Sequence, residues 1–166
     1  MTSDMDQTLL EQFWKLAPTM TEHTPHAEKL GIKFVSVDKG RASMSLPYNT
    51  SLIGFPDSRV IHGGAVTTLL DQVSGLAAMV GFDELVVVAT LNLSIDYMRA
   101  AKPGETLIAQ AHCYKATKHV AFVRGVAHDG DDTDPIATSL ATFMVTQRLG
   151  MPQPDKTDDK TGGQHA

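Results

Sequence analysis

The sequence has a single cysteine, Cys113, and its aromatic residues make up only 6% of the chain. One cysteine excludes a disulfide within the chain and is typical of a reducing compartment, so we expect a cytoplasmic protein. No block of lysine and arginine is present, and the formal net charge is −5, which argues against binding to nucleic acid. The first twelve residues are polar and acidic, without the apolar segment of a signal peptide.

Residues 63–82 form the longest apolar stretch, and Asp71 is its only charged residue. The stretch is long enough to span a membrane, but four glycines, Gln72 and Asp71 argue against a transmembrane helix. An ionised carboxylate in an apolar helix costs roughly several kcal/mol unless a partner compensates it. We therefore expect this helix to use Asp71.

The remaining pattern divides the chain into three parts. Residues 1–29 are expected to form an N-terminal helix, Asp6 to Ala17, ended by Pro18 and followed by a polar connection. Residues 30–148 are expected to form one domain. Residues 149–166 are rich in charged residues, Gly, Pro and Gln and are expected to be a disordered tail.

Alternation of apolar and polar residues predicts strands on both sides of the apolar helix. The predicted strands are Ile32–Val37 and Arg41–Leu46, joined by the turn Asp38-Lys39-Gly40, then Leu85–Tyr97, Thr106–Lys115, Val120–Ala127 and Ile136–Thr146. In Leu85–Tyr97 the apolar residues occupy the odd positions, which predicts one buried face. Hairpin-length turns predict an antiparallel sheet, and a helix apolar nearly all round must be covered on most sides. We therefore predict an α+β hotdog fold, in which an antiparallel curved sheet wraps around one long central helix, with a short N-terminal helix.

The motifs resemble those of the PaaI-like acyl-CoA thioesterases of the hotdog superfamily. They are His62-Gly63-Gly64, Leu69-Leu70-Asp71 and Ala89-Thr90-Leu91-Asn92-Leu93-Ser94-Ile95-Asp96-Tyr97-Met98-Arg99. The resemblance covers about residues 30–148. It implies hydrolysis of acyl-CoA to a free acid and coenzyme A, with no cofactor besides the coenzyme A of the substrate.

The resemblance also implies roles for four residues. Gly63 matches the glycine whose N–H binds the thioester carbonyl, and Asp71 matches the carboxylate that acts as nucleophile or general base. His62 matches a histidine that shapes the turn and helps to place the substrate. Thr90 matches a position that orients the attacking water. Many relatives carry an Asn shortly before the HGG triplet; this chain does not.

Five further residues are predicted to bind the substrate. Gln72 or Thr90 is a candidate to replace the missing Asn. Arg99 and Lys118 are candidates for the coenzyme A phosphates, for which Lys115 and Arg124 are also considered. Gly64 lies on the small-residue face of the helix, and Phe55 is expected in an acyl pocket. The other expected residues of that pocket are Leu52, Ile53, Leu70 and Ser74.

Elementary chemistry supports this assignment and adds a requirement. An unpaired N–H at a helix start stabilises an oxyanion, and a carboxylate supplies the base. Gly63 and Asp71 are eight residues apart, or roughly 12 Å along one helix, whereas both must lie within about 3 Å of one substrate. We therefore predict a homo-oligomer, a dimer or a homotetramer built as a dimer of dimers, with active sites shared between subunits.

Two other functions remain open at this point. One is a hotdog hydratase or dehydratase, and the other is a non-catalytic protein that binds acyl-CoA. No metal site is expected, because the histidines are scattered and the run from Asp129 to Asp134 lacks the ligand spacing of a calcium loop. The acyl group, the pathway and the choice between dimer and tetramer are not readable from the sequence.

Overall fold

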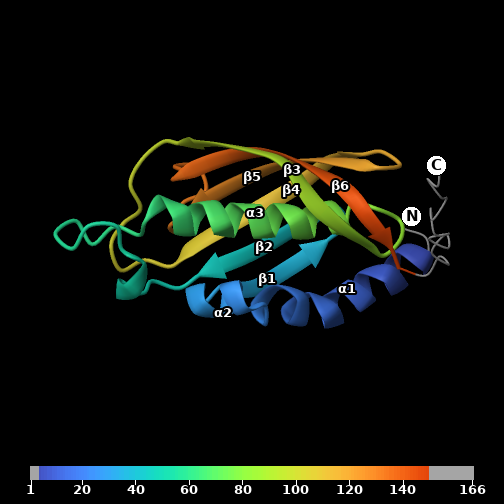
Figure 1. Ribbon diagram of the computed structural model, residues 1–166, viewed down its shortest axis with the longest axis horizontal. Coiled ribbons are helices and arrows are strands. Elements are labelled where there is room, and N and C mark those ends of the chain that lie inside the picture. Colours follow the sequence, from blue (N-terminus) through green and yellow to red (C-terminus); the bar gives the residue numbers. More distant parts are fainter. Residues whose placement is uncertain (1–3, 150–166) are drawn as a thin grey trace, which may run out of the picture.

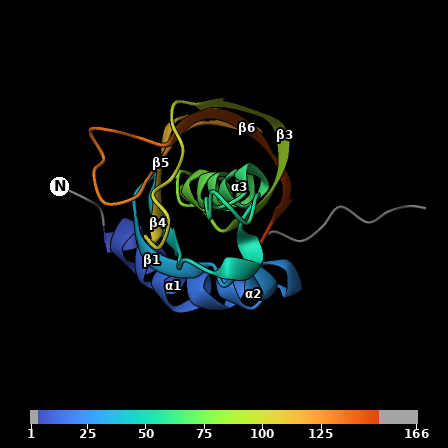
Figure 2. The same ribbon diagram turned by 90° about the vertical axis from the view of Figure 1, so that its left-hand side faces the viewer.

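The computed structural model, which describes residues 4–149, shows an antiparallel sheet curved around one helix (Figures 1 and 2). The strands are β1 (Lys33–Asp38), β2 (Arg41–Leu46), β3 (Val86–Tyr97), β4 (Leu107–Ala116), β5 (Val120–His128) and β6 (Ala137–Arg148). They lie in the order β1-β2-β4-β5-β6-β3, and every neighbouring pair is antiparallel. The predicted hotdog architecture, including the β1–β2 hairpin, is confirmed.

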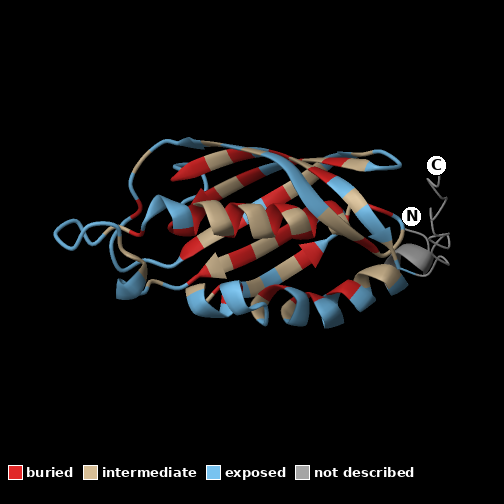
Figure 3. Ribbon diagram, viewed as in Figure 1, coloured by how far each residue is buried: buried red, intermediate tan, exposed pale blue. Residues whose placement is uncertain are grey.

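The central helix α3 (Gly63–Met79) lies inside the curve of the sheet, as Figure 2 shows end-on. Its buried residues are Ala65, Val66, Leu69, Leu70, Val73, Ser74, Leu76, Ala77 and Ala78, which point in most directions around the helix axis. On the strands, burial alternates with period two, as the banding in Figure 3 shows. In β2, for example, Ala42, Met44 and Leu46 are buried, while Arg41 is exposed. The core is therefore the space between α3 and the concave face.

Strand β3 is less buried than the sequence predicts. It forms one edge of the sheet and pairs with β6 alone among the described strands. Leu93 and Ile95 are half-buried, as the alternation predicts, but Leu91 is 56% exposed and Tyr97 is 49% exposed. The prediction of one buried face is therefore only partly right, because a single chain leaves this edge uncovered.

The N-terminal helix is longer than predicted. Helix α1 spans Asp4–Glu22 and continues through Pro18, which the sequence analysis took as its end. Proline removes one helical hydrogen bond, but Ala17 and Thr21 on either side are both buried, and this burial holds the last turn in place. The Thr21 hydroxyl also donates to the Ala17 carbonyl at 2.6 Å.

A second helix, α2 (Pro25–Leu30), lies in the segment predicted as a polar connection. Its start at Pro25 and its end at Gly31 are usual helix boundaries, and both were visible in the sequence. Helices α1 and α2 lie along β1, outside the curve that holds α3 (Figures 1 and 2).

Helix α1 covers the free edge of β1. The Glu22 carboxylate accepts the Phe34 N–H at 2.9 Å and contacts Lys33 Nζ at 3.2 Å. The Trp14 ring packs edge-on against Phe34, with 5.2 Å between the ring centroids. Side chains of the same chain thus occupy one edge of the sheet, whereas no strand within residues 4–149 pairs with the outer edge of β3.

The predicted tail lies outside the described residues except for Leu149, whose N–H donates to the Leu85 carbonyl at 2.8 Å. None of the described helices has both the length and the apolar character needed to cross a membrane. Within residues 4–149, no three His, Cys, Asp or Glu side chains gather in a way that could hold a metal ion.

Candidate active site

The HGG triplet forms the start of α3. His62 is the N-cap residue, and its Nδ1 accepts the Gly64 N–H at 2.9 Å, while its own N–H donates to the Leu52 carbonyl at 2.8 Å. His62 therefore shapes the turn through hydrogen bonds that satisfy a helix-start amide. Gly63 is exposed, and its N–H has no acceptor among the described residues. An amide in this position is available to bind an oxyanion.

Tyr97 fixes the start of α3 against the end of β3. Its hydroxyl donates to the Gly63 carbonyl at 2.7 Å and lies 2.8 Å from Thr67 Oγ1. The sequence analysis included Tyr97 in the motif but gave it no role. Its place in the period-two pattern, on the same face as Leu93 and Ile95, was the signal that its hydroxyl points towards the helix.

Asp71 and Thr90, two of the predicted site residues, lie in contact. The Thr90 hydroxyl donates to Asp71 Oδ1 at 2.9 Å, which joins the third turn of α3 to the middle of β3. Asp71 is half-buried and Thr90 is exposed in the single chain. The register of β3 against β6 shifts between Thr90 and Asn92, so a β-bulge lies beside this contact. The bulge locally redirects side chains at the point where β3 meets Asp71.

A cleft of about 290 Å³ opens beside Asp71. Its lining residues come from α1, α3, β3 and β6, and they are Met20, Thr21, Asp71, Gln72, Gly75, Leu76, Met79, Val87, Val88, Thr90 and Phe143. Most of them are apolar, with the Asp71–Thr90 pair among the few polar groups, which is the usual composition of a small-molecule site. The predicted residue Gln72 lines this cleft, and its Oε1 is buried without a hydrogen-bond partner among the described residues.

The acyl pocket proposed from the sequence does not coincide with this cleft. Phe55 is 77% exposed on the loop before α3, while Leu70 and Ser74 are fully buried in the core. None of these three residues lines the cleft, and neither do Leu52 and Ile53. The loop is close to Asp71 in sequence but packs at the start of α3, whereas Asp71 lies two turns further along, so the loop and the cleft are separate within one chain.

Residues of α1 were also missed as part of the cleft. Met20 and Thr21 lie in the last turn of α1, beyond Pro18, where the sequence analysis expected no helix. A segment assigned as a connection gave no reason to place its side chains near α3. The apolar spacing of Phe13, Ala17 and Met20 was the available signal.

Arg99 is engaged in an ion-pair cluster around the buried Asp129 carboxylate, and its own side chain is half-buried. Its guanidinium contacts both carboxylate oxygens of Asp129, at 2.9 and 2.7 Å, and its Nε lies 2.9 Å from Asp134 Oδ2. The hydrogen bonds from Arg99 hold the pKa of the buried Asp129 carboxyl well below its usual range. The same contacts raise the pKa of Arg99. The geometry therefore gives Arg99 a structural role.

Lys118 lies in the exposed turn between β4 and β5. Its carbonyl accepts a hydrogen bond from Arg148, which also pairs with Glu84. Lys118 is not among the residues that line the cleft, although Ala121 just after this turn is the register partner of the cleft residue Phe143. Gly64 lies at the exposed start of α3, where its N–H is taken by His62.

Comparison with known proteins agrees with this arrangement. The family model of the Thioesterase superfamily matches residues 59–136, which include the HGG triplet, Asp71 and Thr90. The acyl-coenzyme A thioesterase PaaI of Escherichia coli is 30% identical over 130 residues, covering 69% of this chain and 89% of the relative.

Two solved structures extend the similarity. A Pseudomonas aeruginosa protein is 36% identical with a TM-score of 0.71, covering 82% of this chain and 98% of that one. A Streptococcus mutans protein, solved with bound acetyl-CoA, is 25% identical with a TM-score of 0.63, covering 70% of this chain and 90% of that one. The chain therefore belongs to the PaaI-like acyl-CoA thioesterases, a hotdog-fold family of thioester hydrolases.

Proposed function

We propose that the chain hydrolyses acyl-CoA thioesters, with Asp71 as the base or nucleophile and the Gly63 amide as the oxyanion donor. As a base, Asp71 takes a proton from water, whose oxygen bonds to the thioester carbon as the C–S bond breaks. The products are a carboxylic acid and the thiol of coenzyme A. Water supplies every added atom, so the reaction needs no cofactor beyond the substrate itself.

The observation that carries the proposal is the position of Asp71. Its carboxylate lies at a mainly apolar cleft with one oxygen held by Thr90, so the other oxygen remains available to water or to the thioester carbon. A cavity of about 150 Å³ holds benzene in a well-studied protein. The cleft, at about 290 Å³, therefore has room for an aromatic ring or a medium-length acyl chain.

The oxyanion donor must come from a second copy. Gly63 and Asp71 belong to one uninterrupted helix, which separates them by roughly 12 Å. The strand edge explains how a second copy can supply the amide. From Asn92 to Tyr97 the β3–β6 register is unbroken, and the opposite edge of this segment carries no strand.

Antiparallel pairing of the segment Leu93–Tyr97 with itself places Tyr97 of a second copy opposite Leu93, and opposed residues share one face of the sheet. Because Tyr97 holds Gly63, the Gly63 amide of the second copy then lies near Leu93, on the same concave face as α3. Thr90, which holds Asp71, is three residues away, or roughly 10 Å along the strand. The active enzyme is therefore a homodimer or an assembly of such dimers.

The test exploits the backbone at the start of α3. Gly63 is the first residue of the helix, where proline is tolerated, and His62 has φ −61 and ψ 137, the conformation that a residue before proline prefers. Gly63→Pro thus removes the amide hydrogen and keeps the helix start, whereas Gly63→Ala keeps the amide. In a thiol-release assay with acyl-CoA substrates, we expect Gly63→Pro, Asp71→Ala and Asp71→Asn to lose activity and Gly63→Ala to retain most of it.

Mixing the inactive variants tests the shared site. A hybrid of Gly63→Pro and Asp71→Ala subunits contains one intact site, so random mixing should restore about a quarter of the native activity. Mixtures that remain inactive at every ratio contradict the shared site. Asp71 variants that turn over at the native rate contradict the assignment of the base.

A cytoplasmic location agrees with the free thiol of Cys113 and is tested by cell fractionation.

A further inference from the structure

Three basic side chains form a row on the convex face of the sheet, opposite the side that holds α3. Arg41 on β2 is the register partner of His112 on β4, and His112 is the register partner of Arg124 on β5. Arg41 and Arg124 are exposed and His112 is half-buried, while the adjacent residue Ala42 is buried towards α3. Directly opposed residues on neighbouring strands lie about 5 Å apart, so the three side chains are immediate neighbours.

Neither arginine of the row is paired with an acid within residues 4–149, although Asp38 lines one end of the surface trough that holds the row. No carboxylate among the described side chains forms an ion pair with Arg41 or Arg124, although the chain carries a net charge of −5. Asp38 is the register partner of Arg41, but its Oδ1 accepts the Lys39 N–H at 2.7 Å. Burial, and then the charges of Arg41 and Arg124, lower the pKa of His112.

The Arg124 side chain is held in place, because its guanidinium lies over the Tyr114 ring, 4.5 Å from the ring centroid. Two guanidinium groups that flank His112, with neither paired to an acid in the described part of the chain, are suited to an external anion.

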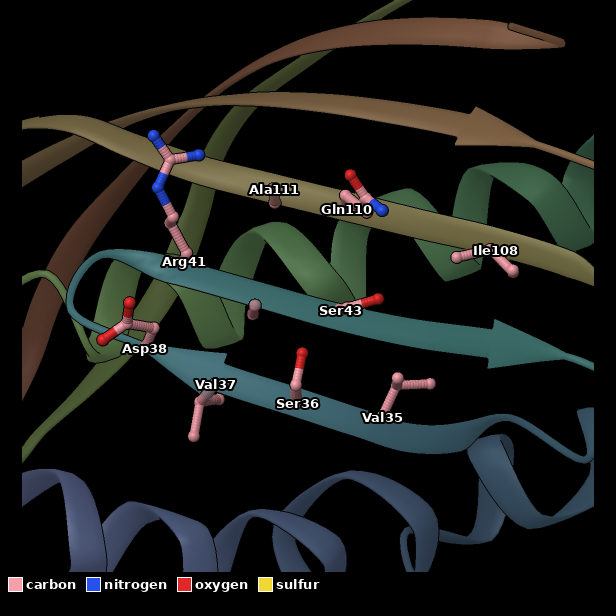
Figure 4. Close-up of a pocket in the computed structure, with 10 residues that line it drawn as sticks. Val35, Ser36, Val37, Asp38, Arg41, Ser43, Ile108, Gln110 and Ala111 are labelled. Carbon is pink, nitrogen blue, oxygen red and sulfur yellow. The ribbon is translucent and has the colours of Figure 1, made fainter. Parts of the chain in front are cut away.

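Two hollows meet at this row. One, of about 500 Å³, lies over β1, β2 and β4, and the other, of about 260 Å³, continues over β5. They share Arg41, Gln110 and Ala111, so together they form one trough. Figure 4 shows the Arg41 side chain extending from β2 towards β4, with Ser43 and Gln110 presenting polar groups nearby.

We propose that this trough binds the phosphoryl groups of a small anionic molecule. The planar guanidinium groups of Arg41 and Arg124 present paired N–H donors that match phosphate oxygens. Ser43 and Gln110 add neutral donors, and Val35 and Ile108 offer apolar contact to the rest of the ligand. The sheet separates the trough from the cleft beside Asp71, so this is a second site.

A phosphoryl group at this position has two possible sources. One is the nucleotide end of a coenzyme A thioester, and the other is a free phosphorylated metabolite. The chemistry of recognition is the same in both cases, so the experiment must separate them. The assignment of the phosphoryl group to a coenzyme A thioester rests on the proposed thioesterase function, whereas direct binding of an anion to the trough does not.

The experiment measures binding of pyrophosphate and of adenosine 3′,5′-bisphosphate to the full chain by isothermal titration calorimetry. The double variant Arg41→Gln/Arg124→Gln removes two charges from the trough. The matched control Lys15→Gln/Lys29→Gln removes two exposed charges from α1 and α2. We expect the native protein and the control to bind equally, and the trough variant to bind about tenfold more weakly or worse.

Thermal unfolding tests whether the trough variant is still correctly folded. Without ligand, the trough variant should unfold at a temperature close to that of the native protein, because both substituted side chains are exposed. Pyrophosphate should raise the unfolding temperature of the native protein and leave that of the variant unchanged. Equal binding by all three proteins, or no binding by the native protein at millimolar probe, overturns the proposal.

Steady-state kinetics with two substrates identify the source. If the trough holds the coenzyme A phosphates, the trough variant raises KM for an acyl-CoA and leaves KM unchanged for the corresponding acyl-pantetheine, which lacks those phosphates. If the ligand is a free metabolite, the variant loses anion binding while both KM values stay at the native level.

Discussion

At the scale of single residues, the contact between Thr90 and Asp71 is the most informative feature. The sequence predicted both residues, because a lone carboxylate in an apolar helix and a threonine in the strand motif are visible without a structure. It did not predict that they touch, because contact depends on a bulge in β3 that no residue type marks. Gly63 was likewise identified, but its link to Tyr97 was not.

The Thr90–Asp71 hydrogen bond gives a prediction about turnover. Thr90→Val keeps the shape of the side chain and removes the donor to Asp71 Oδ1. Hydrogen bonds to charged groups contribute about 1.5–3 kcal/mol, so we expect kcat to fall by roughly 10- to 100-fold with a small change in KM. Thr90→Ser should restore most of the rate. Native kcat in Thr90→Val would show that the hydroxyl does not hold the carboxylate during the reaction.

The Arg99–Asp129 cluster gives a prediction about stability and pH. The pKa of Asp129 is lowered in the folded state, so its stabilising contribution is present above the ordinary Asp pKa of about 3.9. That contribution is lost as the pH falls below this value, because the unfolded state then takes up a proton that the folded state resists. We expect Asp129→Asn to lower the free energy of unfolding at pH 7 by about 3–5 kcal/mol.

Chemical denaturation across pH checks this prediction. Stability of the native protein should decline below about pH 4, and the Asp129→Asn variant should show a flatter decline over the same range. Parallel pH profiles for the two proteins would assign the acid sensitivity to other carboxylates.

At the scale of helices and strands, the sequence predicted the types of the long elements well. The change from a helical to a period-two pattern after residue 82 located α3 and the following strands to within a few residues. Two errors share one cause. The extension of α1 past Pro18 and the exposure of β3 both depend on what covers the element, and local residue pattern does not contain that information.

The role of α1 as a cover for β1 is testable through Glu22. Glu22→Ala removes the acceptor of the Phe34 N–H. Burial alone would raise the pKa of Glu22, but its hydrogen bonds to Phe34 and Lys33 outweigh burial, so the pKa is lowered. We expect the free energy of unfolding to fall by about 1–2 kcal/mol, measured by urea denaturation. Glu22→Gln, which keeps a neutral acceptor, should lose less. Equal stability of the native and Ala proteins would mean that water replaces the carboxylate at no cost.

At the scale of the whole molecule, the fold was predictable from the sequence, and so was the proposal that two copies share one site. One chain holds Asp71, Thr90 and the cleft, yet its own Gly63 amide is roughly 12 Å away along the helix. The sequence indicated this through the eight-residue separation of Gly63 and Asp71 on one helix. The convex trough was not indicated, because Arg41, His112 and Arg124 are far apart in sequence and meet only through strand register.

A shared site predicts that activity depends on protein concentration. On serial dilution, specific activity should fall over the range in which light scattering shows the assembly separating into single chains. Substrate should shift that range to lower concentration, because it binds the assembled form. Constant specific activity in a preparation shown to be monomeric would be incompatible with a site formed by two copies.

The unequal edges of the sheet have a consequence for how large the particle can grow. A sheet with two bare margins can recruit chain after chain and extend into a fibre. Here the Glu22 side of the sheet is occupied by its own helix, and only the β3 margin can accept a neighbour. Lateral joining therefore ends after one event, and the same geometry that allows the proposed two-copy site also opposes open-ended polymerisation.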